Sequence, residues 1–169
     1  MKSVLETLAW DSAKSTELFL SGPDLLGLMR QVLDRGLLFR FRARGWSMSP
    51  FIRDGDVISI APLGKKDPRV GDVVAFTHPD NDHLIVHRLV GLHNSTYLIQ
   101  GDNLFCSPDG LIPVNALLGK VTKVEREGRT VVLGMGPERV LIAFFSRVGL
   151  LSTIGRIKVV FQRIIAGNE

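Results

Sequence analysis

The chain has 169 residues, of which 45% are hydrophobic, a single cysteine, Cys106, and a formal net charge of 21 − 17 = +4 at neutral pH. The apolar content excludes a disordered chain, and the single cysteine excludes both a disulfide framework and a zinc site made of several cysteines. The longest apolar run, Val140–Phe145, is far shorter than the roughly 20 residues of a spanning helix. We therefore expect no ordinary membrane-spanning helix, and residues 1–10 lack the basic and then apolar layout of a cleaved signal.

The charge is unevenly distributed along the chain. Residues 1–34 have 3 basic and 5 acidic side chains, residues 35–136 have 13 and 10, and residues 137–169 have 5 and 2. A modest basic excess with a single tyrosine is not typical of a nucleic-acid-binding surface. We therefore expect no nucleic-acid partner.

Residues 1–36 predict an N-terminal helical segment. A loose helical pattern runs to about residue 20, and Pro23 with Asp24 is typical of a new helix start. Apolar residues then recur at helical spacing as far as Leu33, and Gly36 is a typical helix end.

From residue 37 to 134 the period of the pattern changes to two, which is typical of β-strands. Phe39 and Phe41 alternate with Arg40 and Arg42, as in a strand with one exposed face. Short strands separated by turn residues follow at Val57–Ala61, Asp72–Phe76, Leu84–Val90, Thr96–Gln100, Gly119–Glu125 and Thr130–Leu133. This spacing predicts a mainly β fold, an antiparallel barrel or sandwich.

Residues 135–169 predict a C-terminal basic amphipathic helical segment, with a helix over 139–154. On a helical wheel Leu141, Phe144 and Phe145 face away from Arg139 and Ser146. Two roles stay open for residues 137–169. The segment packs on the β region or on a second copy, which we favour, or it makes peripheral contact with an anionic membrane surface.

The densest motif is the segment Arg44–Pro50, in which a strand leads into a turn at Ser47. Such a turn exposes a hydroxyl beside backbone N–H groups that can bind an oxyanion. A serine is a weak nucleophile and needs a base. Taken alone, this pattern is more often an ordinary turn serine.

Three further segments follow in order: Val70–Phe76 with a Gly-Asp turn, Ile85–Val90 with one histidine, and the polar loop Gln100–Asp109. Together with the serine motif they resemble the signal peptidase I family and its relatives, the repressor-type autoproteases. The resemblance covers about residues 40–126. It implies a signal-peptidase-like β fold and a serine endopeptidase that uses no metal and no cofactor.

The resemblance implies specific roles at matching positions. Ser47 aligns with the nucleophile and is followed by Met48 and Pro50, as in the family. Asp72 lies in the structural Gly-Asp segment. His87 occupies the position of the base, which is lysine in bacterial signal peptidases and histidine in the endoplasmic-reticulum and archaeal type. A neutral histidine accepts a proton near pH 7.

A histidine base needs a partner that orients it. Asp102 and Asp109 are the two candidates; we favour Asp109, because the first aspartate of this segment is mainly structural in the family. Ser107 matches a serine that the bacterial enzymes have near the base. Both aspartates also fit an ordinary role as caps of turns.

The chain departs from signal peptidases at Gly45 and Trp46, where those enzymes have a serine hydroxyl that helps bind the oxyanion. The oxyanion would then depend on backbone N–H groups, chiefly that of Ser47. A metal site is not expected, since His83 and His87 in one strand lie about 13 Å apart.

We expect a serine endopeptidase that cleaves a precursor or leader peptide. The alternatives are a non-catalytic peptide-binding module of the same fold and a self-cleaving regulator. With no membrane anchor in the sequence, we expect a cytoplasmic protein, with the inner face of the membrane as the place of any peripheral contact. The sequence predicts no oligomeric state.

Overall fold

The computed structural model describes residues 22–64, 67–103 and 106–147. Its strands form one antiparallel sheet in the order β1-β2-β7-β3-β4-β5-β6, with β8 beside β7. In chain order the elements are α1 (Gly22–Asp34), β1 (Phe39–Arg42), β2 (Val57–Pro62), β3 (Val73–Thr77), β4 (Leu84–His93), β5 (Thr96–Gln100), β6 (Pro108–Pro113), a 3-10 turn (Val114–Ala116), β7 (Leu117–Arg126), β8 (Arg129–Thr130) and α2 (Arg139–Arg147).

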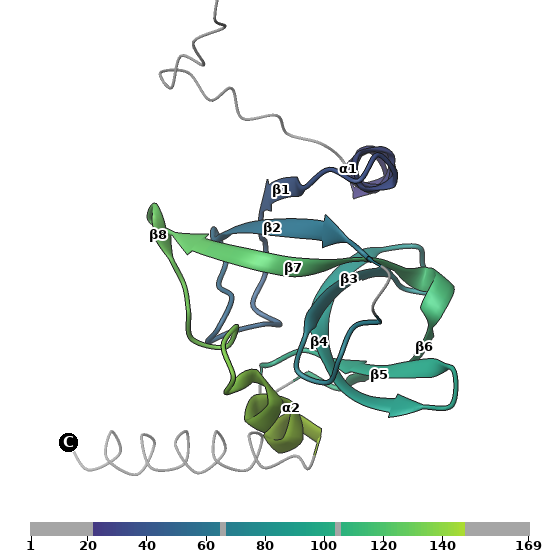
Figure 1. Ribbon diagram of the computed structural model, residues 1–169, viewed down its shortest axis with the longest axis vertical. Helices are drawn as coiled ribbons and strands as arrows, with labels where there is room; N and C mark the ends of the chain where they lie inside the picture. The colour runs from purple at the N-terminus through teal and green to yellow at the C-terminus, as the bar shows by residue number, and fades with distance from the viewer. Residues whose placement is uncertain (1–21, 65–66, 104–105, 148–169) are drawn as a thin grey trace, which may run out of the picture.

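The mainly β fold that the sequence predicts is confirmed. The described strands follow an open path with β1 and β6 at its edges, so the sheet curls but is not closed into a barrel. In Figure 1, α1 lies beside the part of the sheet formed by β1, β2 and β7, and α2 lies at the opposite end of the view, where it contacts β4. The predicted helical pattern before residue 22, and the part of the C-terminal helix after residue 147, lie outside the described residues.

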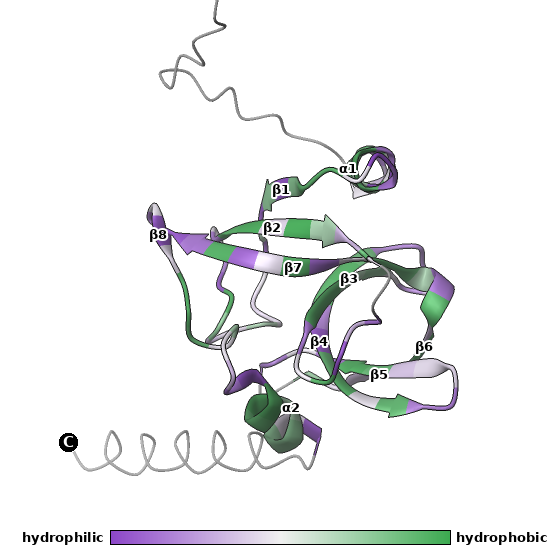
Figure 2. Cartoon of the chain, in the orientation of Figure 1, coloured by the Kyte–Doolittle hydropathy of each residue, from purple (hydrophilic) through white to green (hydrophobic). Residues whose placement is uncertain are grey.

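Two apolar clusters hold the curled sheet together. Hydrophobic residues alternate with hydrophilic ones along much of the sheet in Figure 2. The larger core is closed by α1, whose Met29 and Leu33 are buried against β1, β2 and β7. The smaller core is formed mainly by β3, β4, β5 and β6 and includes Phe76, Leu89 and Ile99. Because neighbouring residues of a strand point to opposite faces, β3 and β4 contribute side chains to both clusters.

Most predicted strands lie where the sequence places them, within about three residues. In β1, Phe39 and Phe41 point inward whereas Arg40 and Arg42 are exposed, as the alternation predicts. Val57–Pro62, Val73–Thr77, Leu84–His93, Thr96–Gln100 and Leu117–Arg126 correspond to the other expected strands. The strand expected at residues 130–133 is wrong in extent, because β8 ends at Thr130.

The sequence prediction missed β6, which lies partly in the segment expected to be a polar loop. Pro108, Gly110 and Pro113 are poor strand formers, and so hid this strand. Proline is tolerated there because β6 is an edge strand and its outer backbone groups have no ladder partner among the described strands. The finding matters for the site, since Asp109 is held on a strand and not on a loop.

Helix α2 begins after Glu138, whose carboxylate accepts hydrogen bonds from the backbone N–H groups of Gly134 and Gly136. It packs on β4 through a buried face that includes Ala143 and Ser146. No helix in the described ranges is both long enough and apolar enough to cross a membrane.

Candidate active site

Ser47 lies in a compact turn between β1 and β2. The backbone N–H of Ser49 donates to the carbonyl of Trp46 at 3.1 Å, and that of Ile52 donates to the carbonyl of Met48 at 3.0 Å. The side chains of Met48 and Ile52 are buried in the larger core. The turn is therefore anchored on both sides of the serine, and Ser47 itself is only partly buried.

The loop after β5 holds this turn from outside. The backbone N–H of Asn103 donates to the carbonyl of Ser47 at 2.8 Å, and the Asn103 amide donates to the carbonyl of Trp46 at 2.9 Å. Gly101 packs so closely that a Cβ there would lie 2.6 Å from the Ser47 carbonyl oxygen. Residue 101 must therefore be glycine for the loop to keep this contact with the turn.

His87 on β4 is buried and paired with an aspartate. Its Nδ1 lies 2.6 Å from Oδ2 of Asp109 on β6, and the two side chains are 10% and 11% exposed. An ionised carboxylate only accepts hydrogen bonds, so the Nδ1 atom carries the proton in this pair. The Nε2 atom of the neutral ring is then the nitrogen that can accept a proton.

Arg88, the next residue of β4, is fully buried. Its guanidinium donates to both carboxylate oxygens of Asp102, at 2.8 and 2.7 Å, and to the carbonyls of Gly71 and Gly134, at 2.7 and 2.9 Å. It also lies over the ring of Phe51, 5.7 Å from the ring centre. Arg88 thus joins four segments that are far apart in the chain.

The two candidate aspartates therefore have different partners. Asp109 contacts His87, whereas Asp102 is bound to Arg88 on the other side of β4. Burial raises the pKa of the Asp102 carboxyl, and the hydrogen bonds and charge of Arg88 act in the opposite direction.

The Arg88–Asp102 pair connects the strand that contains His87 to the loop that contacts the Ser47 turn. Gln100 at the end of β5 pairs with Arg88 on β4, the residue that follows His87. The loop that contacts the Ser47 turn begins directly after Gln100. Within the described part of the chain, no hydrogen bond joins the Ser47 hydroxyl directly to His87. Catalytic hydrogen bonds are often formed only when substrate is bound.

A second, partly buried ion pair supports the serine turn. Both carboxylate oxygens of Asp56 accept hydrogen bonds from Arg126, at 2.8 and 2.7 Å, and Arg126 also donates to the carbonyl of Phe51 at 3.1 Å. Burial raises the pKa of Asp56, but the hydrogen bonds from Arg126 and the backbone of Arg53 outweigh it, so the pKa lies below its ordinary value.

Comparison with known protein families matches residues 14–121 to the Peptidase S24-like family. The chain belongs to the Peptidase S24-like family. The matched range contains Ser47, His87, Asp102 and Asp109. Membership gives the chain the fold of a family of serine peptidases and self-cleaving regulators, as the sequence motifs predict. None of the curated proteins matches the sequence.

Two further residues of this Peptidase S24-like chain, Cys106 and the predicted Ser107, lie just before Asp109 in the sequence. Ser107 is exposed, two residues before Asp109. Cys106 places its Sγ atom 3.8 Å from the carbonyl of Ser47. Burial, followed by the charges of Asp109 and Asp102, raises the pKa of the Cys106 thiol. A thiol that stays protonated is a poor nucleophile, so this environment does not activate Cys106.

Three residues with a structural part in the site were missed from the sequence, namely Arg88, Gly101 and Asn103. An arginine inside an otherwise apolar strand is a signal for a buried charge partner, and the segment Ile85–Val90 contains that signal. The contacts of Gly101 and Asn103 have no comparable signal, because they are made with backbone atoms of a distant turn.

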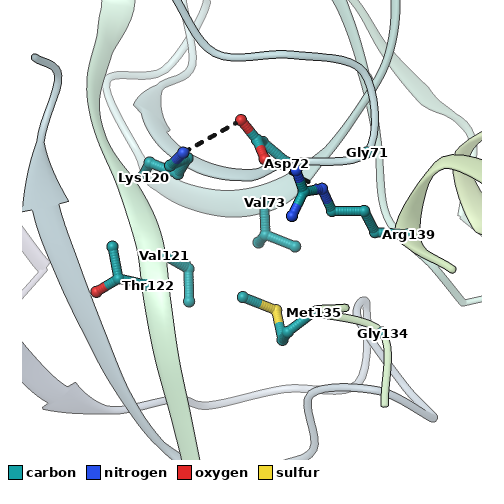
Figure 3. A pocket seen from close by; sticks show the side chains of 9 residues that line it. All are labelled: Gly71, Asp72, Val73, Lys120, Val121, Thr122, Gly134, Met135 and Arg139. Carbon is teal, nitrogen blue, oxygen red and sulfur yellow. Dashed lines mark hydrogen bonds and ion pairs between the residues drawn. The ribbon is translucent and has the colours of Figure 1, made fainter. Parts of the chain in front are cut away.

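Asp72, to which the resemblance assigns a structural role, lines a cavity of about 220 Å³ (Figure 3). One carboxylate oxygen lies 3.4 Å from the Lys120 ammonium and accepts the backbone N–H of Arg69, and the other lies 3.4 Å from Nε of Arg139. The cavity contains neither Ser47 nor His87. Among the described residues, no group of three or more His, Cys, Asp or Glu side chains is arranged to hold a metal ion.

Proposed function

We propose that this chain is a serine endopeptidase in which Ser47 is the nucleophile, His87 the general base and Asp109 the residue that orients the base. The observation that carries the proposal is the 2.6 Å contact between Nδ1 of His87 and Asp109. A buried carboxylate on one nitrogen of an imidazole is the arrangement that makes the other nitrogen a base.

The reaction would follow from that arrangement. Nε2 of His87 takes the hydroxyl proton of Ser47 as Oγ attacks a peptide carbonyl, and Asp109 stabilises the imidazolium that forms. The imidazolium then gives this proton to the leaving amine as the peptide C–N bond breaks, leaving an acyl-enzyme. Water, deprotonated by the same histidine, releases the acyl group.

The oxyanion of the tetrahedral intermediate needs hydrogen-bond donors that are fixed in advance. Gly45 and Trp46 precede the nucleophile, so no side-chain hydroxyl is present there, and the backbone N–H of Ser47 is the main donor we assign. Contacts from Asn103 to the carbonyls of Ser47 and Trp46 support this assignment, since they fix the orientation of the peptide units around the serine.

The substrate we propose is the leader of a precursor peptide, bound as an extended strand with a small side chain at the cleavage site. The resemblance to signal peptidases supports the small side chain. The open edges at β1 and β6 support the extended conformation, because an edge strand is where a peptide can add to a sheet.

Family membership also supports a second candidate, a regulator that cleaves its own chain with the same residues. A non-catalytic peptide-binding module of the same fold is the third, and the absence of a side-chain hydroxyl at Gly45 and Trp46 is the feature that supports it.

The test is incubation of the purified full chain with a library of peptides that vary in small residues, with cleavage followed by mass spectrometry. Ser47→Ala is compared with Ser95→Ala, which changes an exposed serine in the turn between β4 and β5. We expect the wild type and Ser95→Ala to cut the same peptides and Ser47→Ala to cut none. Equal cutting by Ser47→Ala would overturn the mechanism.

The two other candidate functions predict different results in the same peptide-library assay. A self-cleaving regulator cuts its own chain at a rate that does not depend on protein concentration and leaves the library intact. A non-catalytic module binds peptides and cuts neither the library nor itself.

A further inference from the structure

The outward face of α2 is apolar. With about 100° between successive residues of a helix, Ile142, Ala143 and Ser146 share the face buried on the sheet. Leu141, Phe144 and Phe145 lie on the opposite face and are 60%, 58% and 37% exposed. A surface helix ordinarily presents the reverse orientation. We call Leu141, Phe144 and Phe145, together with the exposed Val140, the α2 apolar face.

Packing against the sheet explains this orientation. Ala143 and Ser146 are small, which lets α2 approach β4 closely, whereas phenylalanine side chains on that face would hold the helix away. The segment before α2 adds to the exposed apolar surface, since Val132 and Leu133 are 70% and 65% exposed. Figure 2 shows hydrophobic colour on both the helix and this segment. Exposed apolar surface of this kind is typical of an interaction site.

The charge of the sequence that begins with this helix favours one type of partner. Residues 137–169 have 5 basic and 2 acidic side chains, a net charge of 5 − 2 = +3. The carboxylate of Glu138 is bound to backbone N–H groups, and Arg147 follows the apolar residues on the exposed surface. Two copies of a segment with a net charge of +3 would repel each other, whereas an acidic surface would attract this segment.

We propose that the α2 apolar face docks on an anionic lipid membrane. The helix would lie in the plane of the interface, with Leu141 and Phe144 among the acyl chains and the exposed Arg147 at the headgroups. This inference goes beyond the proposed peptidase, because it depends neither on Ser47 nor on His87. Docking in this way would hold the serine site next to a membrane surface.

The test is sedimentation of the full chain with vesicles of phosphatidylcholine alone or mixed with phosphatidylglycerol. The double variant Leu141→Glu/Phe144→Glu removes two exposed apolar contacts. Leu38→Glu is the matched control, since Leu38 is 63% exposed and directly precedes β1, a strand that lies far from α2 in Figure 1. Circular dichroism and thermal unfolding check that each variant is folded.

We expect the wild type and Leu38→Glu to bind the mixed vesicles, and the double variant to bind at least about tenfold more weakly. Arg147→Gln should weaken binding about fivefold, and added salt should weaken it further. Binding that is equal for both lipid mixtures, or equal for the double variant and Leu38→Glu, would overturn the proposal. So would a wild type that ignores vesicles but forms a dimer that the double variant breaks, because the face would then bind a second copy.

Discussion

The Nδ1 atom of His87 lies 2.6 Å from Oδ2 of Asp109, although 22 residues separate the two in the chain. The fold brings them together, because β4 and β6 are the two neighbours of β5 in the sheet. Both side chains are about one-tenth exposed, so little water competes for the hydrogen bond. The proposed mechanism requires this contact to fix which ring nitrogen is basic.

Replacing Asp109 with asparagine should reduce peptide cleavage by about 10²–10⁴-fold. The amide keeps the size of the side chain but can donate to Nδ1, which moves the ring proton to Nε2 and removes the base. Initial rates measured with a cleaved library peptide check this expectation. Asp80→Asn is the control, since the Asp80 side chain is 88% exposed. Full activity in Asp109→Asn would show that His87 does not depend on this carboxylate.

Replacing Gly101 with alanine should reduce activity about 10²-fold with a smaller effect on folding. The new Cβ would meet the carbonyl of Ser47 at 2.6 Å, and the serine turn would have to shift by an amount that is costly for catalysis. Gly64→Ala is the control, because a Cβ at Gly64 meets nothing within 4 Å. Similar kinetics for the two variants would contradict the proposed coupling between this loop and Ser47.

Replacing Arg88 with methionine should lower the free energy of unfolding by about 3–5 kcal/mol, because it leaves the buried Asp102 without its partner. Urea unfolding measures the loss. Arg40→Met is the matched control; Arg40 pairs with Glu125 at 2.7 Å but its side chain is 59% exposed, so the loss should be below about 1 kcal/mol. Equal losses for the two arginines would refute the structural role of Arg88.

Asp56 should make the fold sensitive to acid. Its pKa is lowered in the folded chain, so the unfolded state takes up the proton first as the pH falls. The stabilisation is complete above about pH 5, and it is lost progressively through pH 4 and below. Asp56→Asn should lower the free energy of unfolding by about 1–3 kcal/mol at pH 7. It should also flatten the dependence of this free energy on pH between about 5 and 3. Urea midpoints across this range measure both effects, and an unchanged slope would count against the assignment.

The pH dependence of cleavage distinguishes a histidine base from a lysine base. Histidine side chains change charge between about pH 5 and 8, so kcat/KM should rise within that range and His87→Ala should lose the rise together with the activity. His87→Lys places the residue of the bacterial enzymes at this position. Any activity it retains should rise only at a higher pH, where a lysine is neutral.

The sequence predicted the parts of the fold that depend on local pattern. The alternation of Phe39 and Phe41 with arginines placed β1, and similar patterns placed most other strands. It did not predict β6, because Pro108 and Gly110 are unfavourable in a strand unless that strand lies at the edge of a sheet, and the position of a strand in a sheet is not a local property.

The sequence likewise predicted only part of the candidate site. Ser47 and His87 were selected from motifs that resemble a known family, and the preference for Asp109 came from the same source. The contacts of Arg88 with the carbonyls of Gly71 and Gly134 could not be predicted from the sequence, because every residue has a backbone carbonyl whatever its type. The outward orientation of Phe144 on α2 was not predicted either, since it depends on how closely Ala143 approaches β4.

The most direct test of the central claim is intact-mass spectrometry of the full chain after brief exposure to the p-nitrophenyl ester of an N-acylated alanine. Attack by Ser47 forms an ester to Oγ and releases p-nitrophenolate, so the mass rises by that of the acyl group. The mechanism predicts that peptide mapping places the acyl group on Ser47 in the wild type, with no adduct in Ser47→Ala and much slower formation in His87→Ala. Acylation of Cys106 instead, or an equal rate in His87→Ala, would contradict it.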